Sequence, residues 1–589
     1  MITLRIALAQ IDVTVGDIES NTAKVRDYLA RAKAHQVHLV LFPELALAGY
    51  PPEDLLLKPG FAAANRAALE SLRPDTRGLT AIVGFVDWRD DLFNAAAILH
   101  DGKLAGIYHK LLLPNYAVFD EDRYFAQGDT PLLFTLAPAA SSATPPSLTR
   151  EVCFGVSICE DIWYPAGPPQ GQAVAGAELL LNISASPYQS GKIKSRERML
   201  ATRAADNVAI VAFCNLVGGQ DELVFDGSSL ILDERGNLIA RAKSFEEDWL
   251  VAEVDLGNVF RQRLRDPRRR KNNLTERSAD SFERISLPLV TSPARSHRPI
   301  TAPVTPPLER LAEIYRALVL GTRDYVRKNG FSKVTMGLSG GIDSSLVATI
   351  AVDALGAENV IGVSMPSRYS SDHSKSDATE LAGHLGIRYE VIPIELAYQA
   401  YLDMLAPAFA ETRPNEAEEN LQSRARGNIL MALSNKFGWL VLTTGNKSEM
   451  AVGYATIYGD MAGGFAVIKD VPKTLVYELC RYRNEHIGPV IPDNVLIKPP
   501  SAELRPDQKD TDSLPEYEVL DAILAAYVED DYSAAEIIAL GFDEATVRRV
   551  IRMVDRNEYK RRQAPPGPKI TSKAFGKDRR LPITNRYGG

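Results

Sequence analysis

Cysteine and histidine are scarce in this chain, with four and eight residues among 589. Cysteines this few and this far apart in a long chain do not form a disulfide framework. They form no CxxC pair, so we do not expect a zinc site. A single cysteine in a cleft can still act as a nucleophile. The four are Cys153, Cys159, Cys214 and Cys480.

The sequence also lacks long apolar runs and a strong excess of one charge. No apolar stretch approaches the roughly 18–20 residues of a membrane-spanning helix, and the N-terminus begins with a strand-like pattern instead of a signal peptide. The net charge of −8 argues against nucleic-acid binding through bulk charge. We therefore expect a soluble, cytoplasmic protein without a nucleic-acid or membrane partner. Its 589 residues exceed what one core can organise, which predicts at least two domains.

Residues 1–260 alternate short apolar runs with helical stretches, which predicts one α/β domain with the layers of a sandwich. Turn signals separate the runs, and 137–148 is expected to be a surface loop. The predicted strands cover residues 3–9, 38–42, 80–86, 94–99, 152–158, 178–183, 208–214, 228–232 and 249–254.

Residues 261–307 are predicted to connect two domains. Their first part, Arg261 to Lys271, is basic, which is most simply read as a solvated or subunit-contacting segment. Six prolines fall between Pro288 and Pro307. Prolines at this density exclude a helix or a central strand, so we expect an interdomain linker there.

Residues 308–563 predict a second α/β domain, in which strands and helices alternate. This alternation is typical of a Rossmann-like parallel sheet with right-handed crossovers. The tail 564–589 is basic and rich in proline and glycine, a composition that suggests a flexible or partner-docked segment. The predicted helices are 308–328, 343–355 and 374–385, and the predicted strands are 333–337, 359–365 and 388–393.

Three residues of the first domain stand where strands are predicted to end, and each suits one role in amide hydrolysis. Cys159 can attack a carbonyl carbon, but its thiol is mostly protonated at neutral pH. Glu44 can accept the thiol proton and return it to the departing amine. Lys110 can stabilise the thiolate and the tetrahedral oxyanion. We predict that these three form a catalytic triad, and Glu121 and Glu160 are further carboxylates near it without an assigned role.

The stretches PEL, HKLLLPN, ICEDIW and NISASPY around these residues resemble the nitrilase superfamily of carbon–nitrogen hydrolases over about residues 2–260. The resemblance implies an α-β-β-α sandwich and a Glu–Lys–Cys triad. Similarity to the glutaminase branch implies that Tyr116, Ser186 and Lys192 line a glutamine site, with Lys192 pairing with the α-carboxylate.

A glycine-rich loop connects the first predicted strand and helix of the second domain. Its glycines let backbone amides approach an anion, and the helix that follows adds a favourable dipole. Ser339 and Ser344 add hydroxyl donors, and Asp343 can ligate Mg²⁺. The loop lacks the GK[ST] ending of a Walker A motif and instead resembles the SGGxDS loop of the ATP pyrophosphatases. The expected ATP-binding residues are Gly337, Leu338, Ser339, Gly340, Gly341, Ile342, Asp343 and Ser344.

Further motifs narrow the resemblance to the NAD⁺ synthetase family over about residues 310–563. They are NLQSRAR, TTGNKSE, YGD, KDVPKT and SLPEYEVLD. The resemblance implies that Thr444 binds ATP, that Asn420, Glu449 and Lys560 bind deamido-NAD, and that Lys473 lies near the phosphates. Glu449 would join Asp343 at Mg²⁺. The family commonly has His where this chain has Tyr559, directly before Lys560.

Together the two resemblances imply that ammonia from glutamine amidates deamido-NAD after ATP activates its carboxylate. An enclosed path for ammonia, Mg²⁺ as cofactor, ATP as co-substrate and a homo-oligomer are further expectations. The alternative enzyme is an amidotransferase that acts on another carboxylate through the same ATP loop. A regulatory protein built on decayed domains would have lost Cys159, Lys110 or Asp343, and all three are present.

Overall fold

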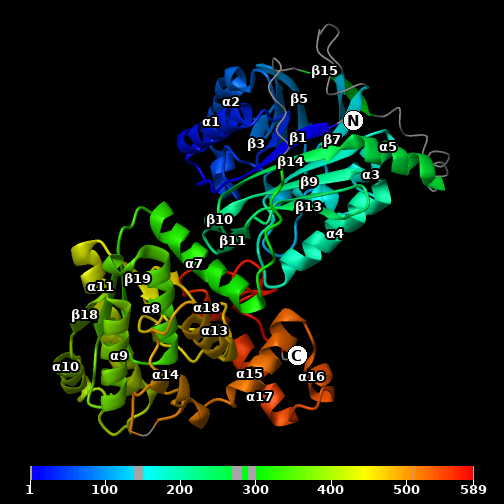
Figure 1. Cartoon of the computed structure of the whole chain (residues 1–589). Coiled ribbons are helices and arrows are strands. Elements are labelled where there is room, and N and C mark those ends of the chain that lie inside the picture. The colour runs from blue at the N-terminus through cyan, green and yellow to red at the C-terminus, as the bar shows by residue number, and fades with distance from the viewer. Residues whose placement is uncertain (1–2, 138–149, 268–281, 290–299, 507, 588–589) are drawn as a thin grey trace. The chain divides into compact units, whose positions relative to one another are not determined.

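The computed structural model of the chain describes residues 3–137, 150–267, 282–289, 300–506 and 508–587. The chain divides into two compact units (Figure 1). The first comprises Met1–Gln220 and Phe225–Leu308, and the second comprises Asp221–Val224 and Glu309–Gly589. The domain boundaries drawn from the sequence at 260, 308 and 563 stay predictions.

Within the described residues, the first unit contains two large sheets. One has six strands in the order β14 (Asp248–Asp255), β1 (Thr3–Gln10), β2 (Leu39–Leu41), β3 (Thr80–Trp88), β4 (Leu92–His100) and β5 (Lys103–His109). The other has seven, in the order β13 (Leu238–Arg241), β12 (Leu230–Leu232), β9 (Ile210–Asn215), β8 (Leu179–Ser184), β7 (Val152–Ile158), β6 (Leu132–Ala137) and β15 (Glu283–Pro288). A small hairpin joins β10 (Val217–Gln220) and β11 (Leu223–Asp226).

The two sheets pack face to face because both present apolar side chains to one shared core. Leu4, Ile6 and Leu8 of β1 and Phe154 and Val156 of β7 belong to the same buried cluster. Helices cover the outer faces, with α2 against β3 and both α3 and α4 against the second sheet (Figure 1). The predicted α-β-β-α sandwich is confirmed. Its helices are α1 (Ile18–Ala34), α2 (Pro59–Leu72), α3 (Pro168–Val174) and α4 (Lys192–Asn207).

The segment between the predicted domains contains one strand. Residues Glu283–Pro288 form β15, which pairs in parallel with β6 at the edge of the sheet, where proline is tolerated. Arg241 donates its backbone N–H to Pro303 O at 3.0 Å. The strand ends where the predicted proline-rich linker begins, and the linker stays a prediction. The basic stretch begins within helix α5 (Leu256–Arg265). The remaining parts, 268–281 and 290–299, and most of the predicted loop 137–148 lie outside the described residues.

The second unit is built on a parallel five-stranded sheet in the order β18-β17-β16-β19-β20. This order reverses direction between β16 and β19, and such a switch point opens a crevice at the carboxyl ends of the strands. The predicted Rossmann-like parallel sheet is confirmed. The strands are β16 (Val334–Gly337), β17 (Val360–Ser364), β18 (Arg388–Val391), β19 (Leu440–Thr443) and β20 (Phe465–Ala466). The helices around the sheet are α7 (Arg310–Lys328), α8 (Ile342–Leu355), α9 (Asp372–Leu385), α10 (Glu395–Leu405), α11 (Glu416–Phe437), α12 (Lys447–Val452), α13 (Lys473–His486) and α14 (Asp493–Ile497).

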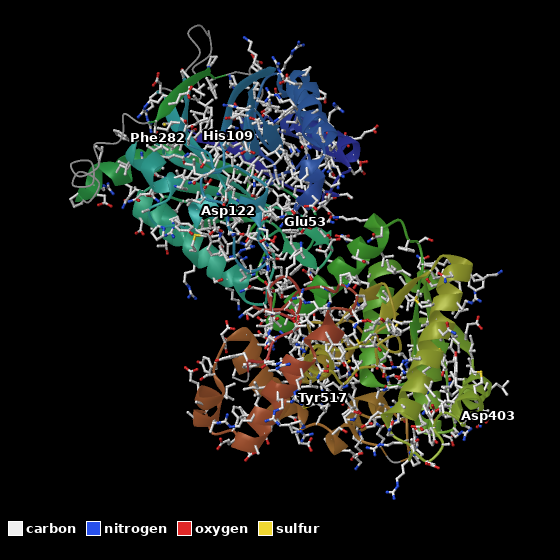
Figure 2. The ribbon with its side chains drawn as sticks, turned by 180° about the vertical axis from the view of Figure 1, so that it is seen from behind. Glu53, His109, Asp122, Phe282, Asp403 and Tyr517 are labelled. Carbon is white, nitrogen blue, oxygen red and sulfur yellow. The ribbon has the colours of Figure 1, made fainter. Side chains whose placement is uncertain are left out.

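A helical cluster completes the second unit, and the C-terminal tail packs into it. Leu520, Val550 and Phe575 share one apolar core, to which Tyr517, labelled in Figure 2, also belongs. Phe575 comes from the tail, so the tail is packed against its own chain and is not a loose extension. The helices are α15 (Tyr517–Leu524), α16 (Ala534–Ala539), α17 (Glu544–Arg556) and α18 (Glu558–Arg561). No helix in the described part of the chain is long and apolar enough to cross a membrane.

Buried charges fasten the tail to helix α12. Lys447, at the start of α12, lies 3.0 Å from Asp470 Oδ1 and donates to Thr571 Oγ1 at 2.7 Å. Asp470 also accepts the backbone N–H groups of Ile570 and Thr571, both at 2.8 Å. The burial of Lys447 works against its positive charge, but Asp470 and Glu529 hold its pKa above the ordinary value. The tail is therefore tied to the helix that carries Glu449.

We expect Lys447→Met to destabilise α12 and the tail by about 3–5 kcal/mol, because Asp470 would keep a buried negative charge without its partner. Amide hydrogen exchange in the full chain, followed by mass spectrometry of the peptide 447–452, measures this change. Lys573→Met is the control, since Lys573 pairs with the exposed Asp531 and such pairs contribute little. Equal exchange in the two variants would contradict the assigned role of Lys447.

Two candidate active sites

Three strands of the first unit, two from one sheet and one from the other, lead into the residues predicted as a triad. Glu44 follows β2, Lys110 follows β5 directly, and Cys159 begins the short 3₁₀ turn after β7. His109, which Figure 2 labels, is the last residue of β5 and marks the position of Lys110. The three side chains are 0%, 1% and 3% exposed. Burial at this level is unusual for Glu and Lys unless they are paired.

Lys110 supplies that pairing, because its ammonium lies between two carboxylates. Lys110 Nζ donates to Glu44 Oε1 and to Glu121 Oε1, both at 2.7 Å. The other Glu44 oxygen accepts the backbone N–H of Ala185 at 2.8 Å, and Asn94 Nδ2 donates to Glu44 Oε1 at 2.8 Å. Glu44 is thus held from three directions in the orientation that a general base needs.

Glu121 had no role in the sequence analysis, and the structure places its carboxylate against Lys110. It lies 11 residues after Lys110 in the chain, and its Oε1 also accepts the Tyr50 hydroxyl at 2.9 Å. Burial raises the pKa of Glu121, while the Lys110 ammonium opposes that rise. The two carboxylates and burial act on Lys110 in opposite directions, and the carboxylates prevail, so its pKa lies well above the ordinary value. Lys110 therefore carries a permanent positive charge.

Cys159 has a strained backbone, with φ at +42°. Non-glycine residues seldom adopt this conformation, and such strain is often found at functional sites. Asp161 stabilises the bend, because its carboxylate accepts Ile158 N–H at 2.9 Å and Leu112 N–H at 2.9 Å. Burial raises the pKa of the Cys159 thiol, Glu44 raises it further, and Lys110 lowers it. The thiol is therefore close enough to both other members of the triad to interact with their charges.

Of the three residues predicted to bind glutamine, Tyr116 and Lys192 both interact with Glu160. The Tyr116 hydroxyl donates to both Glu160 oxygens, at 2.9 and 3.0 Å, and the charge of Lys192 lowers the pKa of the same carboxyl against the stronger effect of burial. Glu160 directly follows Cys159, so Tyr116 and Lys192 lie near the predicted nucleophile. Ser186 is buried, and its backbone N–H donates to Asn215 Oδ1 at 2.9 Å. Lys192 Nζ donates to Pro187 O at 2.9 Å.

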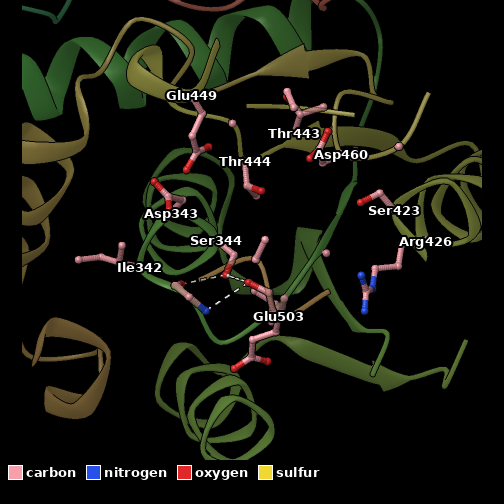
Figure 3. Close-up of a pocket in the computed structure, with 18 of the residues that line it drawn as sticks. Ile342, Asp343, Ser344, Ser423, Arg426, Thr443, Thr444, Glu449, Asp460 and Glu503 are labelled. Atoms are coloured by element: carbon pink, nitrogen blue, oxygen red, sulfur yellow. Dashed lines mark hydrogen bonds between the residues drawn. The ribbon is translucent and has the colours of Figure 1, made fainter. Parts of the chain in front are cut away.

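The glycine-rich loop of the second unit joins β16 to helix α8 and borders a cavity of about 320 Å³ (Figure 3). Ser339 Oγ lies 3.1 Å from Ser344 Oγ, and Ser344 Oγ donates to Gly341 O at 3.0 Å. These contacts close the loop over the N-terminus of α8, where backbone N–H groups favour an anion. Of the predicted loop residues, all but Gly340 line the cavity.

Asp343 and Glu449 face each other in this cavity beside Thr444 (Figure 3). Lys473 Nζ lies 2.5 Å from Asp343 Oδ2 and 3.3 Å from Glu449 Oε1, so it bridges the two carboxylates. Asn446 Nδ2 donates to the other Asp343 oxygen at 2.9 Å. Burial raises the pKa of Glu449 and Lys473 opposes the rise, whereas the carboxylates hold the pKa of Lys473 above its ordinary value.

Asn420 and Lys560 do not line the cavity. They meet instead on one neighbouring segment, where Thr456 donates to Asn420 Oδ1 at 2.6 Å and Lys560 Nζ donates to Gly453 O at 2.7 Å. Residues Tyr454–Ala455 and Gly459–Ala462 of this segment do line the cavity. The two predicted residues therefore support the cavity wall in this structure.

Arg426, Asp460 and Glu503 are among the polar residues that line the cavity and had no predicted role. Burial lowers the pKa of Arg426 to about 10 and raises that of Asp460 to about 6. Asp460 belongs to the YGD stretch and Arg426 to NLQSRAR, so the motifs contained the signal. Glu503 accepts hydrogen bonds from Ser371 and Ser374, contacts that join segments far apart in the sequence.

Family models match both units. Residues 5–263 match the carbon-nitrogen hydrolase model, and residues 314–564 match the NAD synthase model. With the folds and sites above, these matches define a two-part protein that joins an amidase-type domain to a synthase domain. Similarity over the whole length goes further, and the chain belongs to the family of glutamine-dependent NAD(+) synthetases.

The relatives that show this membership cover nearly the whole chain. A glutamine-dependent NAD(+) synthetase from Aquifex aeolicus is 50% identical and covers 99% of this chain and 100% of the relative. One from Thermotoga maritima is 50% identical and covers 99% of each. A solved synthetase of this name from Acinetobacter baumannii, in complex with adenosine diphosphate, is 42% identical, with 99% of each chain covered and a TM-score of 0.72.

We expect Gly340→Ala to weaken ATP binding by at least about tenfold. Gly340 has φ at +77°, and an added Cβ would lie 2.1 Å from Ser374 O, so the loop must shift. Gly341→Ala is the control, because its Cβ would meet only the Ser339 hydroxyl at 3.3 Å and its φ is negative. Calorimetric titration of both variants with ATP gives the comparison. ATP affinities that match within twofold would show that the loop geometry is not needed.

Proposed function

We propose that the chain hydrolyses glutamine at Cys159 and uses the ammonia, with ATP, to convert deamido-NAD⁺ to NAD⁺, AMP and pyrophosphate. The observation that carries the proposal is that one chain contains both sites. The first has the buried Glu44–Lys110 ion pair near Cys159. The second has a glycine-rich loop beside the Asp343–Lys473–Glu449 cluster. The names of the full-length relatives support the same reaction.

The amidase step begins with transfer of the Cys159 proton to Glu44. The thiolate then attacks the carboxamide carbon of glutamine, and the developing oxyanion is stabilised by the Lys110 ammonium. Glu44 returns the proton to the nitrogen, ammonia leaves, and a thioester remains on Cys159. Glu44 next takes a proton from water, which hydrolyses the thioester to glutamate and restores the thiol.

Glutamine is selected by its charged α-groups. Lys192 would pair with the α-carboxylate, with the Tyr116 and Ser186 hydroxyls as further donors. Glu160 suits the α-ammonium, since its carboxylate lies next to the nucleophile and already accepts the Tyr116 hydroxyl. Tyr116 is 54% exposed, which fits a position at the entrance of the site.

In the second unit, the nicotinate carboxylate of deamido-NAD⁺ attacks the α-phosphorus of ATP. The pyrophosphate leaves against the backbone amides of the loop from Gly337 to Ser344, and Lys473 neutralises charge on the phosphates. Thr444 contributes to the ATP site. Ammonia then attacks the acyl-adenylate, and AMP departs. Adenylation is required because an unmodified carboxylate oxygen is a poor leaving group.

Asp343 and Glu449 would hold Mg²⁺, which supplies neutralising charge to the phosphates. They fit the ion because both are hard oxygen donors that already lie around one cation, the Lys473 ammonium. Two carboxylates with the phosphates of ATP suit Mg²⁺, which is seldom held by protein groups alone. Among the described residues, no three His, Cys, Asp or Glu side chains form a metal cluster.

The proposed acceptor of ammonia is deamido-NAD⁺. Asn420, Glu449 and Lys560 would bind deamido-NAD⁺, although Asn420 and Lys560 lie behind the cavity wall. Turnover of deamido-NAD⁺ against other carboxylates separates this acceptor from the alternative amidotransferase. A homo-oligomer, a cytoplasmic location and an enclosed ammonia path stay predictions from the sequence.

We expect Cys159→Ala to abolish NAD⁺ formation from glutamine and to leave formation from high ammonium largely intact. The thiol is needed only to release ammonia, and removing the nucleophile disables the whole triad. Cys153→Ala is the control, since Cys153 lies on the same strand, β7, away from the triad. Assays with deamido-NAD⁺, ATP and each nitrogen source give the answer. Glutamine use by Cys159→Ala would refute the assigned nucleophile.

We expect Asp343→Ala to abolish NAD⁺ formation with either nitrogen source, because both routes need the activated carboxylate. The loss follows from removing a carboxylate that holds Mg²⁺ and Lys473 in the ATP site. Asp372→Ala is the control, since Asp372 is also in the first turn of a helix but is exposed. Near-normal ammonium-driven turnover in Asp343→Ala would remove this residue from the mechanism.

A further inference from the structure

The Ser184 hydroxyl is buried without a partner beside the nucleophile. Ser184 ends strand β8 and is 0% exposed, and its Oγ has no hydrogen-bond partner among the described residues. A buried hydroxyl that makes no hydrogen bond is costly, because it has lost its contacts with water. A buried hydroxyl of this kind needs an explanation.

The strand register places Ser184 next to Cys159. Strands β7 and β8 are parallel, with Ser157 opposite Asn182 and Ile158 opposite Ile183. Cys159 and Ser184 each follow directly on the last paired residues, Ile158 and Ile183. The residue after Ser184 also contacts the site, since Ala185 N–H donates to Glu44 Oε2 at 2.8 Å. Ser184 therefore lies at the strand end beside the nucleophile, directly before the residue that holds Glu44.

The charges around the Cys159 thiol indicate that a second hydrogen-bond donor would help to stabilise the thiolate. Burial and the Glu44 carboxylate oppose ionisation of Cys159, whereas Lys110 and the Ser184 hydroxyl lower the pKa of the thiol. Lys110 shares its charge with Glu44 and Glu121, which reduces what it can give to the sulfur. Among these groups, Ser184 is the neutral donor, and it has no other acceptor.

We propose that Ser184 donates its hydroxyl hydrogen to Cys159 Sγ when the thiol ionises, and thereby acts as a further catalytic residue of glutamine hydrolysis. The Cys159 proton passes to Glu44, and Ser184 keeps its own proton throughout, so the serine stabilises the thiolate without entering the proton transfer. The inference rests on the proposed glutaminase reaction, but it concerns a contact that can be measured without turnover.

The neighbouring strand offers a matched control. Ser157 is as buried as Ser184 and lies two residues before Cys159. Its hydroxyl donates to Leu181 O at 3.4 Å and accepts Asn182 Nδ2 at 3.0 Å, so it has partners of its own. Ser157→Ala therefore removes a buried hydroxyl near the site without removing the proposed donor.

The experiment follows alkylation of Cys159 by iodoacetamide against pH in the full chain, with the Cys159 peptide quantified by mass spectrometry. Ser184→Ala should raise the inflection by about one pH unit, which corresponds to an about tenfold loss of thiolate below it. Ser184→Thr should restore the original profile, and Ser184→Val should not. Thr and Val have nearly the same shape, so this pair separates the hydroxyl from the packing.

A second measurement follows glutamine hydrolysis. In Ser184→Ala, kcat/KM for glutamine should fall about tenfold at neutral pH and recover as the pH rises, while ammonium-driven NAD⁺ formation stays unchanged. An alkylation profile that is the same in Ser184→Thr and Ser184→Val, or that shifts equally in Ser157→Ala, would overturn the inference. Glutamine hydrolysis by Cys159→Ala would instead refute the proposed function and leave the alkylation result to stand separately.

Discussion

A buried lysine that must be neutralised organises the amidase site. Lys110 is almost fully enclosed, and a buried ammonium is stable only when acids and hydrogen-bond acceptors surround it. Glu44 and Glu121 are 77 residues apart in the chain, and both pair with this ammonium. The lysine therefore fixes the positions of the two carboxylates relative to each other. The general base is thereby oriented, and the positive charge needed for the oxyanion is already in place before substrate binds.

The synthase site also has a lysine between two carboxylates, but this lysine borders a cavity. Lys473 lies between Asp343, from the first turn of α8, and Glu449, from the first turn of α12. This cluster borders a cavity, whereas Lys110 is enclosed. Asp343 and Glu449 would hold Mg²⁺ there, which would supply neutralising charge to the phosphates, and Lys473 would be left to pair with the phosphates.

The sequence was a good guide where the signal is local. Apolar runs placed all nine predicted strands of the first domain within two residues of their ends, because each run is bounded by turn residues. The SGGIDS loop was located between its strand and helix for the same reason. Strands with mixed burial, such as β5 with Lys103 exposed, were missed because their pattern is not apolar enough to separate them from loops.

Features that depend on long-range pairing could not be predicted. Glu121 gives no local signal, and its role appears only once the fold brings it to Lys110. The composition of the tail suggested a loose extension, because the partner of its backbone, Asp470, lies 100 residues earlier. The positive φ of Cys159 follows from contacts with Asp161 and is not encoded by the residue type. Asn420 and Lys560 stay predicted ligands, and neither lines the cavity in this structure.

Burial of Cys159 raises the pKa of its thiol, and it also strengthens the charge interactions that act on the reaction. Burial and Glu44 raise the pKa of the thiol and so disfavour the thiolate, which is the form that oxidants attack. The same exclusion of water strengthens every charge that acts during attack, above all the Lys110 ammonium. The proton transfer from Cys159 to Glu44, with which the proposed amidase reaction begins, would therefore depend on the positive charge that Lys110 places near the sulfur.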